Sequence, residues 1–209
     1  NCEKIYQLIK KPIVAIDAYG EPDETDPAHV VNIGLDDEDG GYQMTKYLLE
    51  CGYEEIKICA GRDNGVDHLR YLGAQKAMSE RATDSQKLQF VALGMNYEKR
   101  KAGYDWLNMR KKPKTALFFL SDMYALEAIR FYSDKKLSVP DEIGVAGYDD
   151  ISYAQYSTPR LTTIKQDVER KAKLAVELVM KWIDDGVMPE EKDILLPVVL
   201  VKRDSVVQQ

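Results

Sequence analysis

The sequence predicts an α/β fold in which helices cover both faces of a parallel β-sheet. Two observations lead to this prediction. Short, near-continuous apolar runs alternate with longer stretches whose apolar residues recur at helical spacing. The order strand, helix, strand also repeats along the chain, and strands joined by helical crossovers run parallel to one another.

The predicted strands are short, and most are apolar throughout, as expected for strands buried on both faces. In chain order they are Ile13–Ile16, His29–Ile33, Ile56–Ala60, Gln89–Leu93, Thr115–Leu120, Ile143–Ala146, Leu161–Lys165 and Ile194–Val201.

The predicted helices lie between these strands and show apolar residues three or four positions apart. They include Met44–Cys51, Asp67–Met78, a stretch around Tyr104 and Leu107, Ala125–Tyr132 and Ala175–Ile183. Gly186 stands where a helix C-cap is expected, and Asp122 where an N-terminal carboxylate stabilises a helix. The acidic run 36–39 also precedes a helix, so we interpret it as compensation of the helix dipole rather than as a metal site.

The composition indicates a soluble protein that binds nucleic acid poorly by itself. The net charge is -6, and affinity for DNA comes largely from Lys and Arg side chains that neutralise phosphates. The 3 cysteines form no Cys-x-x-Cys pair, which fits reduced thiols and a cytoplasmic location. The first residues show no signal-peptide pattern and begin within a helical pattern, so we expect further residues upstream.

Motifs for catalysis and metal binding are weak. The 2 histidines, His29 and His68, have no metal-ligand spacing, and the sequence contains no Gly-x-Ser-x-Gly, phosphate-loop or dinucleotide-binding motif. We therefore expect no enzymatic activity, no cofactor and no bound metal.

Polar side chains follow successive strands at the edge where parallel sheets bind ligands. They include Asp17, Tyr97, Ser121, Asp149 and Gln166. Carboxylates, an amide and an aromatic ring suit a polar ligand rich in hydroxyl groups. A structural role remains open for each: Asp149 could be a turn residue, and a helix-capping role is favoured for Asp122. Arg70, within a predicted helix, could be an ordinary surface arginine.

Three segments carry a family resemblance that extends over essentially the whole chain. Residues 138–150 read SVPDEIGVAGYDD, residues 159–166 read PRLTTIKQ, and residues 196–203 read LPVVLVKR. They resemble the VPxDIxVxGYDD, PxLTTIxQ and LPxxLVxR signatures of the LacI/GalR transcriptional regulators. Four positions depart from the family pattern. Tyr53 replaces a His, Ser121 replaces an Asn and Glu127 replaces a Gly, and Val168 stands where some sugar-binding members have an aromatic residue.

The resemblance implies a type I periplasmic-binding-protein-like fold, with two Rossmann-like lobes joined by three crossovers. The N-terminal lobe would comprise residues 1–34 and 166–193, and the C-terminal lobe residues 35–165 and 194–209. Relative to family members, the first lobe is expected to be incomplete. The helix-turn-helix that reads operator DNA is expected to lie outside this sequence.

By resemblance, the chain is the effector-sensing and dimerisation domain of a sugar-responsive bacterial regulator, most simply a repressor. The effector would be a sugar or sugar phosphate. The family's effector contacts correspond to Asp17, Arg70, Ser121, Asp149 and Gln166, and Tyr97 would provide an aromatic platform.

A homodimer is expected, with contacts from one helix and from the aromatic stretch that follows residue 150. The candidate interface residues are Ala125, Ile129, Tyr132, Tyr153 and Tyr156. An equal alternative is that these residues belong to the core of their own lobe. Two other functions stay open at this point: an extracytoplasmic sugar-binding protein of a transport system, and an enzyme on a doubly wound sheet.

Overall fold

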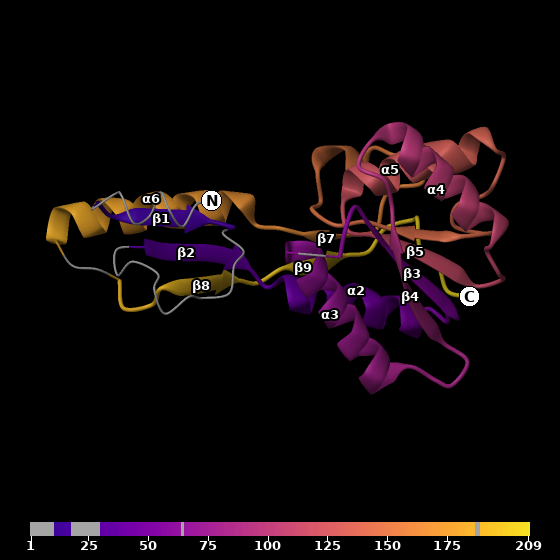
Figure 1. The fold of residues 1–209 in the computed structure, drawn as a ribbon, viewed down its shortest axis with the longest axis horizontal. Helices are drawn as coiled ribbons and strands as arrows, with labels where there is room; N and C mark the ends of the chain where they lie inside the picture. Colours follow the sequence, from indigo (N-terminus) through magenta and orange to yellow (C-terminus); the bar gives the residue numbers. More distant parts are fainter. Residues whose placement is uncertain (1–10, 18–29, 64, 187–188) are drawn as a thin grey trace. The chain divides into compact units, whose positions relative to one another are not determined.

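The structure of the chain is a computed structural model that describes residues 11–17, 30–63, 65–186 and 189–209. The chain folds into two compact units (Figure 1). Unit 1 contains Asn1–Asp36 and Asp167–Pro197, and unit 2 contains Asp37–Gln166 and Val198–Gln209. Each unit is therefore built from two separate stretches of sequence, and the chain passes between the units more than once.

Unit 2 is organised around a four-stranded parallel sheet with the order β4-β3-β5-β6. Its strands are β3 (Glu55–Ala60), β4 (Lys87–Ala92), β5 (Thr115–Phe119) and β6 (Gly144–Ala146). Every residue of β5 is buried, whereas burial is incomplete along β4 at the edge of the sheet. The predicted parallel α/β arrangement is confirmed.

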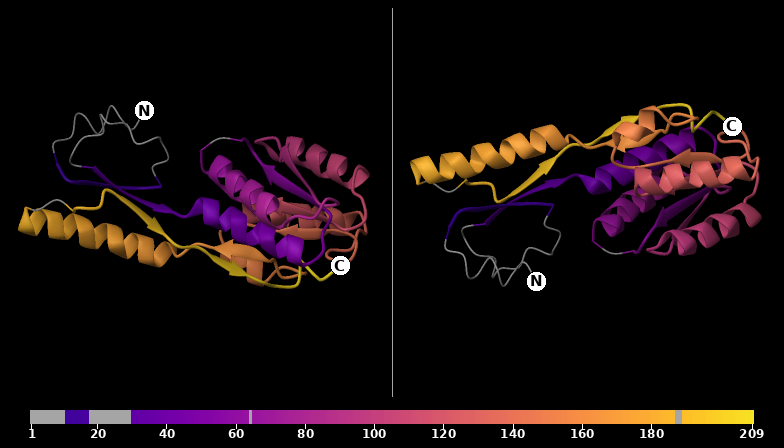
Figure 2. Two further views of the ribbon diagram at one scale, coloured as in Figure 1. Left: turned by 90° about the horizontal axis from the view of Figure 1, so that it is seen from below. Right: turned by 90° about the horizontal axis from the view of Figure 1, so that it is seen from above.

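Helices cover both faces of this sheet, as Figures 1 and 2 show. One face carries α2 (Asp37–Glu50) and α3 (Gly65–Arg81), and the other carries α4 (Tyr97–Met109) and α5 (Asp122–Asp134). An apolar core cluster lies under α4 and α5 and includes Tyr104, Leu107, Tyr132 and Phe119; the rings of Tyr104 and Phe119 contact each other edge to face.

Helices α2 and α3 approach each other so closely that glycine is required at the contact. A Cβ atom on Gly41 would lie 1.9 Å from the carbonyl oxygen of Arg70, and one on Gly73 would lie 1.8 Å from that of Glu38. Neither backbone oxygen can move away without displacing its helix. The two glycines thus fix the distance between the helices, and with it the position of Asp37 relative to Arg70.

The last segment of the chain completes unit 2. Strands β7 (Thr163–Lys165) and β9 (Val199–Val201) form an antiparallel pair. Buried Ser205 donates from Oγ to the carbonyl oxygen of Val145 in β6, at 2.5 Å, and its Oγ accepts from the backbone N–H of Thr162, at 2.8 Å. Residues far apart in sequence are therefore joined at the edge of the sheet.

The described part of unit 1 contains a three-stranded sheet and one long helix. The sheet has the order β1-β2-β8, and all its pairings are parallel. Its elements are β1 (Ile13–Ile16), β2 (Val30–Leu35), β8 (Asp193–Leu196) and the helix α6 (Val168–Asp185), which packs on β1. Helix α6 begins with Asp167 as its N-cap and ends at Gly186, whose positive φ of 67° matches the predicted C-cap.

The structure differs from the sequence analysis near the unit boundaries. The single strand predicted over Ile194–Val201 is divided into β8 in unit 1 and β9 in unit 2, because Pro197 lacks the backbone N–H that a continuous ladder needs. The boundaries expected at residues 34/35 and 193/194 fall inside β2 and β8. The chain instead passes between the units at residues 36/37 and 197/198, and the third passage lies at 166/167, one residue from the expected 165/166.

Candidate ligand-binding site

The carboxyl ends of the strands in unit 2 open onto one edge of the sheet, and the polar residues that follow them gather there. A hollow of about 690 Å³ lies at this edge, a size within the range of small-molecule sites. Its lining comes from the segments after β3, β4 and β5 and from the first turns of α3 and α5. The lining residues are Ala60, Gly61, Arg62, Asp67, Met95, Leu120, Ser121, Met123 and Tyr124.

Arg70 is buried beside this hollow and contacts Leu120 of its lining. Its Nε donates to Oδ1 of Asp37 at 2.8 Å, and its Nη1 donates to the carbonyl oxygen of Leu120 at 2.8 Å. Its guanidinium carbon lies 3.6 Å from the centre of the Tyr148 ring. Burial opposes the charge of Arg70, but the adjacent Asp37 carboxylate outweighs it and leaves the pKa of Arg70 above its ordinary value. The alternative of an ordinary surface arginine is therefore wrong.

Asp149 and Gln166 contact each other at the end of β6. Gln166 donates from Nε2 to Oδ1 of Asp149 at 2.6 Å. The backbone of Asp149 has a φ of 114°, a strained value that its N–H bond to the carbonyl oxygen of Ile164, at 2.8 Å, helps to hold. Burial raises the pKa of the Asp149 carboxyl to about 6, although the nearby positive charge of Arg70 acts against this. The side chain thus presents a carboxylate whose hydration is already reduced.

Ser121 and Tyr97 have different places relative to the hollow. Ser121 precedes α5 and lines the hollow, and its hydroxyl makes no cap bond to the helix. Tyr97 is the first residue of α4 and is 50% exposed, but it is not among the residues that line the hollow. The segment after β4 contributes Met95 there instead. Sequence analysis selected Tyr97 in this segment because it is aromatic, and nothing in the sequence pattern pointed to Met95 instead.

Asp17 belongs to unit 1 and follows β1. Its Oδ2 accepts from Nζ of Lys171 in α6 at 2.6 Å, and its Oδ1 is buried without a hydrogen-bond partner among the residues that the structure describes. Its φ is 52°, in the left-handed region, and its N–H donates to the carbonyl oxygen of Ile33 at 2.9 Å. Lys171 therefore holds one oxygen of this carboxylate, and the other oxygen can still accept a hydrogen bond.

Sequence reasoning missed Asp37 and assigned Asp122 too small a role. Asp37 lies in the acidic run attributed to the helix dipole, but it is fully buried against Arg70. Asp122 is the first residue of α5, and its carboxylate accepts from Oγ1 of Thr163 at 2.6 Å and from the backbone N–H of Ile151 at 2.9 Å. Asp122 thus joins the helix to β7 and to the loop after β6. Burial raises the pKa of Asp122 to about 7, against the effect of these two hydrogen bonds.

The candidate interface residues divide into two groups. Ala125 and Tyr132 are completely buried in the core of unit 2, so the structure contradicts their assignment to a dimer surface. Ile129 is also mostly buried, although it borders a second hollow of about 510 Å³ on the outside of α5. Tyr153 and Tyr156 line that hollow too and are 71% and 76% exposed. They follow β6 and lie in and just after the short helix η1 (Ser152–Gln155).

Two kinds of feature are absent from the described part of the chain. No group of three or more His, Cys, Asp and Glu side chains is placed to hold a metal ion. No helix there is both long enough and apolar enough to cross a membrane.

Comparison with known protein families gives a match over most of the sequence. Residues 45–206 match the periplasmic binding protein-like domain. The chain belongs to this family. Within it, the chain is an effector-binding domain of the LacI/GalR kind, as the signature segments had indicated and as regulators similar in sequence and in structure support.

Curated relatives of this periplasmic binding protein-like domain are transcriptional regulators. The regulator MalR of Clostridium butyricum is 31% identical over 208 residues, which cover 97% of this chain and 60% of that protein. The repressor PurR of Haemophilus influenzae is 33% identical over 172 residues, which cover 79% of this chain and 50% of that protein. The chain thus spans about half to three-fifths of the length of these relatives.

Solved structures of regulators share the fold. A LacI family regulator from Enterococcus faecium with bound ribose has a TM-score of 0.80 and 23% identity, and the match covers 95% of this chain and 71% of that one. A dimeric Lac repressor with an 11-residue C-terminal deletion has a TM-score of 0.76 and 25% identity, with 93% of this chain and 68% of that one covered. These likenesses confirm the predicted type I periplasmic-binding-protein-like fold.

Proposed function

We propose that the domain is the effector sensor of a sugar-responsive transcriptional repressor. The observation on which this depends most is the hollow at the carboxyl edge of the unit 2 sheet. Buried Arg70 donates to the carbonyl oxygen of Leu120, which lines this hollow, and the pair of Asp149 and Gln166 follows strands of the same unit. Regulators similar in sequence, and a neighbour in structure with bound ribose, support the same function. The whole regulator would act in the cytoplasm, on operator DNA.

The effector would be bound through hydrogen bonds and would not be transformed. Asp149 offers a carboxylate held by Gln166, and Ser121 offers a hydroxyl that is not used to cap a helix. An effector contact by Asp17, which belongs to unit 1, stays a prediction. Carboxylates that accept from ligand hydroxyls contribute roughly 1.5–3 kcal/mol each. A ligand that binds one arrangement of the units better than another would shift the population by that difference in affinity.

A homodimer is part of this proposal. Tyr153 and Tyr156, with the outer side of α5, form the second hollow and leave large aromatic surfaces exposed. Tyrosines that bury their rings while their hydroxyls stay in contact with water are common at protein interfaces. The dimeric Lac repressor among the structural neighbours has a related fold.

A binding screen tests the sensor proposal. The 209-residue chain is heated with ribose, xylulose, cellobiose, maltose, ribose 5-phosphate or a purine base, and the unfolding temperature is measured. A ligand at 100 times its dissociation constant should stabilise the chain by about 2.7 kcal/mol. Asp149→Asn should weaken the binding of that ligand about tenfold or more.

The matched control is Asp204→Asn. Asp204 pairs with Arg160 on the surface and is not part of the hollow. This variant should bind the ligand like the unchanged protein. Lack of stabilisation by every compound in the screen, or equal loss of binding in both variants, would contradict the proposal.

A further inference from the structure

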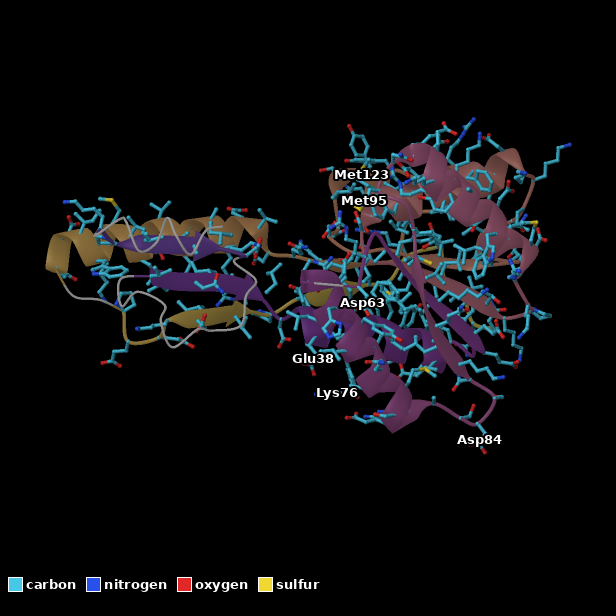
Figure 3. All side chains as sticks on the ribbon, viewed as in Figure 1. Glu38, Asp63, Lys76, Asp84, Met95 and Met123 are labelled. Carbon is cyan, nitrogen blue, oxygen red and sulfur yellow. The ribbon has the colours of Figure 1, made fainter. Side chains whose placement is uncertain are left out.

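The hollow of unit 2 has an apolar wall that the sensor proposal does not explain. Met95 and Met123 line it from the segment after β4 and from the first turn of α5, and they are 59% and 51% exposed. Both are labelled in Figure 3, on the same side of the unit. Tyr124, next in the chain, extends the wall. Thioethers and the face of an aromatic ring form only weak hydrogen bonds with the hydroxyl groups of a sugar, but they pack well against apolar groups of a ligand.

This wall is held in place by an ion pair inside the unit. Arg100 of α4 donates from Nη1 to the carbonyl oxygen of Met95 at 2.9 Å, and its guanidinium carbon lies 4.6 Å from the centre of the Tyr124 ring. Glu127 of α5 accepts from Nε and Nη2 of Arg100, at 2.7 Å and 2.8 Å. Arg100 therefore contacts both Met95 and Tyr124, while Glu127 fixes the orientation of the guanidinium.

Two of the departures from the family pattern lie at this wall. Glu127, which stands where the family signature has Gly, supplies the carboxylate that orients Arg100. Ser121, which stands where the signature has Asn, is a shorter side chain in the lining of the hollow. Gly61 also contributes, since a Cβ at this position would lie 2.9 Å from the sulfur of Met95. The departures at Glu127 and Ser121 thus hold Arg100 against Met95 and leave space in the hollow beside Met95.

We propose that Met95, Met123 and Tyr124 determine specificity by selecting effectors that carry an apolar group, such as an aryl glycoside, beside their hydroxyls. This inference rests on the proposed sugar-sensing function. The polar side of the same hollow, with Ser121 and Asp67, would hold the sugar ring. The apolar group would then lie on the sulfur atoms and the tyrosine ring. Burying a phenyl ring there should strengthen binding about tenfold or more over a methyl group.

Matched pairs of glycosides test this inference. Phenyl and methyl glycosides of ribose, glucose and galactose are titrated into the 209-residue chain by calorimetry. In at least one pair the phenyl glycoside should bind about tenfold more tightly than the methyl glycoside. The double variant Met95→Ser, Met123→Ser should lose most of this preference, measured as the ratio of the two dissociation constants. Met109→Ser, a change at a methionine that is exposed at the end of α4, is the control and should keep the preference.

A second readout distinguishes contact with the wall from a general effect on folding. The ε-methyl groups of the 7 methionines are labelled with carbon-13 and followed by NMR. The signals of Met95 and Met123 should shift with the phenyl glycoside, while that of Met109 should not. Glu127→Gln, which weakens the ion pair with Arg100, should reduce the preference for phenyl without abolishing methyl glycoside binding.

The possible failures differ from each other. If a sugar binds but phenyl and methyl glycosides bind equally, or the Met95 and Met123 signals stay unchanged, the wall has no role in specificity and the sensor proposal is unaffected. If a free sugar of the thermal screen binds but no glycoside does, this inference alone fails. If no glycoside binds and no sugar of the screen stabilises the chain, the sugar-sensing function is contradicted, and this inference falls with it.

Discussion

The guanidinium carbon of Arg70 lies 3.6 Å from the centre of the Tyr148 ring, while its Nε donates to the buried Asp37 carboxylate. One side chain thus joins α3 to the start of α2 and to the loop after β6. Arg70 and Asp37 form a buried ion pair, and each charge compensates the free-energy cost of burying the other.

Loss of Arg70 should therefore destabilise unit 2 strongly. Arg70→Met leaves Asp37 buried without its cationic partner, and the free energy of unfolding should fall by about 3–5 kcal/mol. Denaturation by urea, followed by circular dichroism, measures this change. Arg160→Met is the matched control, because the ion pair between Arg160 and Asp204 is on the surface and its loss should change stability little. Equal effects of the two substitutions would show that the buried pair has no special role.

The stability of the chain should depend on pH through Asp122. Its folded-state pKa is raised to about 7 from an ordinary value of 3.8. A carboxyl with a raised folded pKa binds its proton more tightly in the native state, so its contribution is present below about pH 4 and is lost as the pH rises through 7. Each pH unit in this window changes the free energy of unfolding by at most about 1.4 kcal/mol.

Asp122→Asn removes this titration. The difference in unfolding free energy between pH 5 and pH 8 should be smaller in the variant than in the unchanged chain. Asp204→Asn replaces a surface carboxyl whose pKa is lowered by Arg160, and it should leave that difference unreduced. An identical pH dependence of the Asp122→Asn variant and the unchanged chain would exclude this carboxyl as its source.

The contact between α2 and α3 should tolerate no side chain at Gly73. A Cβ there would lie 1.8 Å from the backbone oxygen of Glu38, so Gly73→Ala should cost about 1–3 kcal/mol or more through displacement of the helices. Gly103→Ala in α4 is a suitable comparison, because its nearest atom is the end of the Leu93 side chain, at 2.7 Å, which can move. Both changes gain helix propensity, and thermal unfolding separates them. A stability of Gly73→Ala equal to that of Gly103→Ala would refute the close backbone contact.

The exposed tyrosines next to η1 should control self-association. Tyr153→Glu together with Tyr156→Glu places charges on the rim of the second hollow, and the chain should sediment as a monomer. Met109→Glu alters another exposed apolar residue, at the far end of α4, and should leave the association state unchanged. Sedimentation velocity at several concentrations decides the matter, and dimers that persist in the double variant would exclude this surface.

Sequence reasoning succeeded where a local pattern determines the structure. Strand β1 lies at its predicted bounds, and β3 and β5 differ from theirs by one residue at one end, because continuous apolar runs between polar residues have few alternative placements. It failed at β8 and β9, where the apolar run continues across Pro197 although the two halves pair with different partners. Pairing between distant segments leaves no local pattern.

The site was predicted in part for a similar reason. Residues directly after strands, such as Ser121 and Asp149, could be placed at the sheet edge by position alone. The burial of Asp37 could not, because it depends on how closely two helices approach through Gly41 and Gly73. The role of Met95 depends on Arg100 and Glu127, which are separated from each other by 27 positions. Such contacts are set by packing rather than by periodicity.

Ser205 has a consequence for how the protein is made. Unit 2 begins at Asp37, but the hydroxyl that closes its sheet edge onto Val145 and Thr162 is supplied from beyond Pro197. During synthesis the helices and central strands emerge first and must wait for this closing segment to leave the ribosome. Until then the newly made chain exposes an unfinished edge at which chaperones, or a neighbouring copy, could bind.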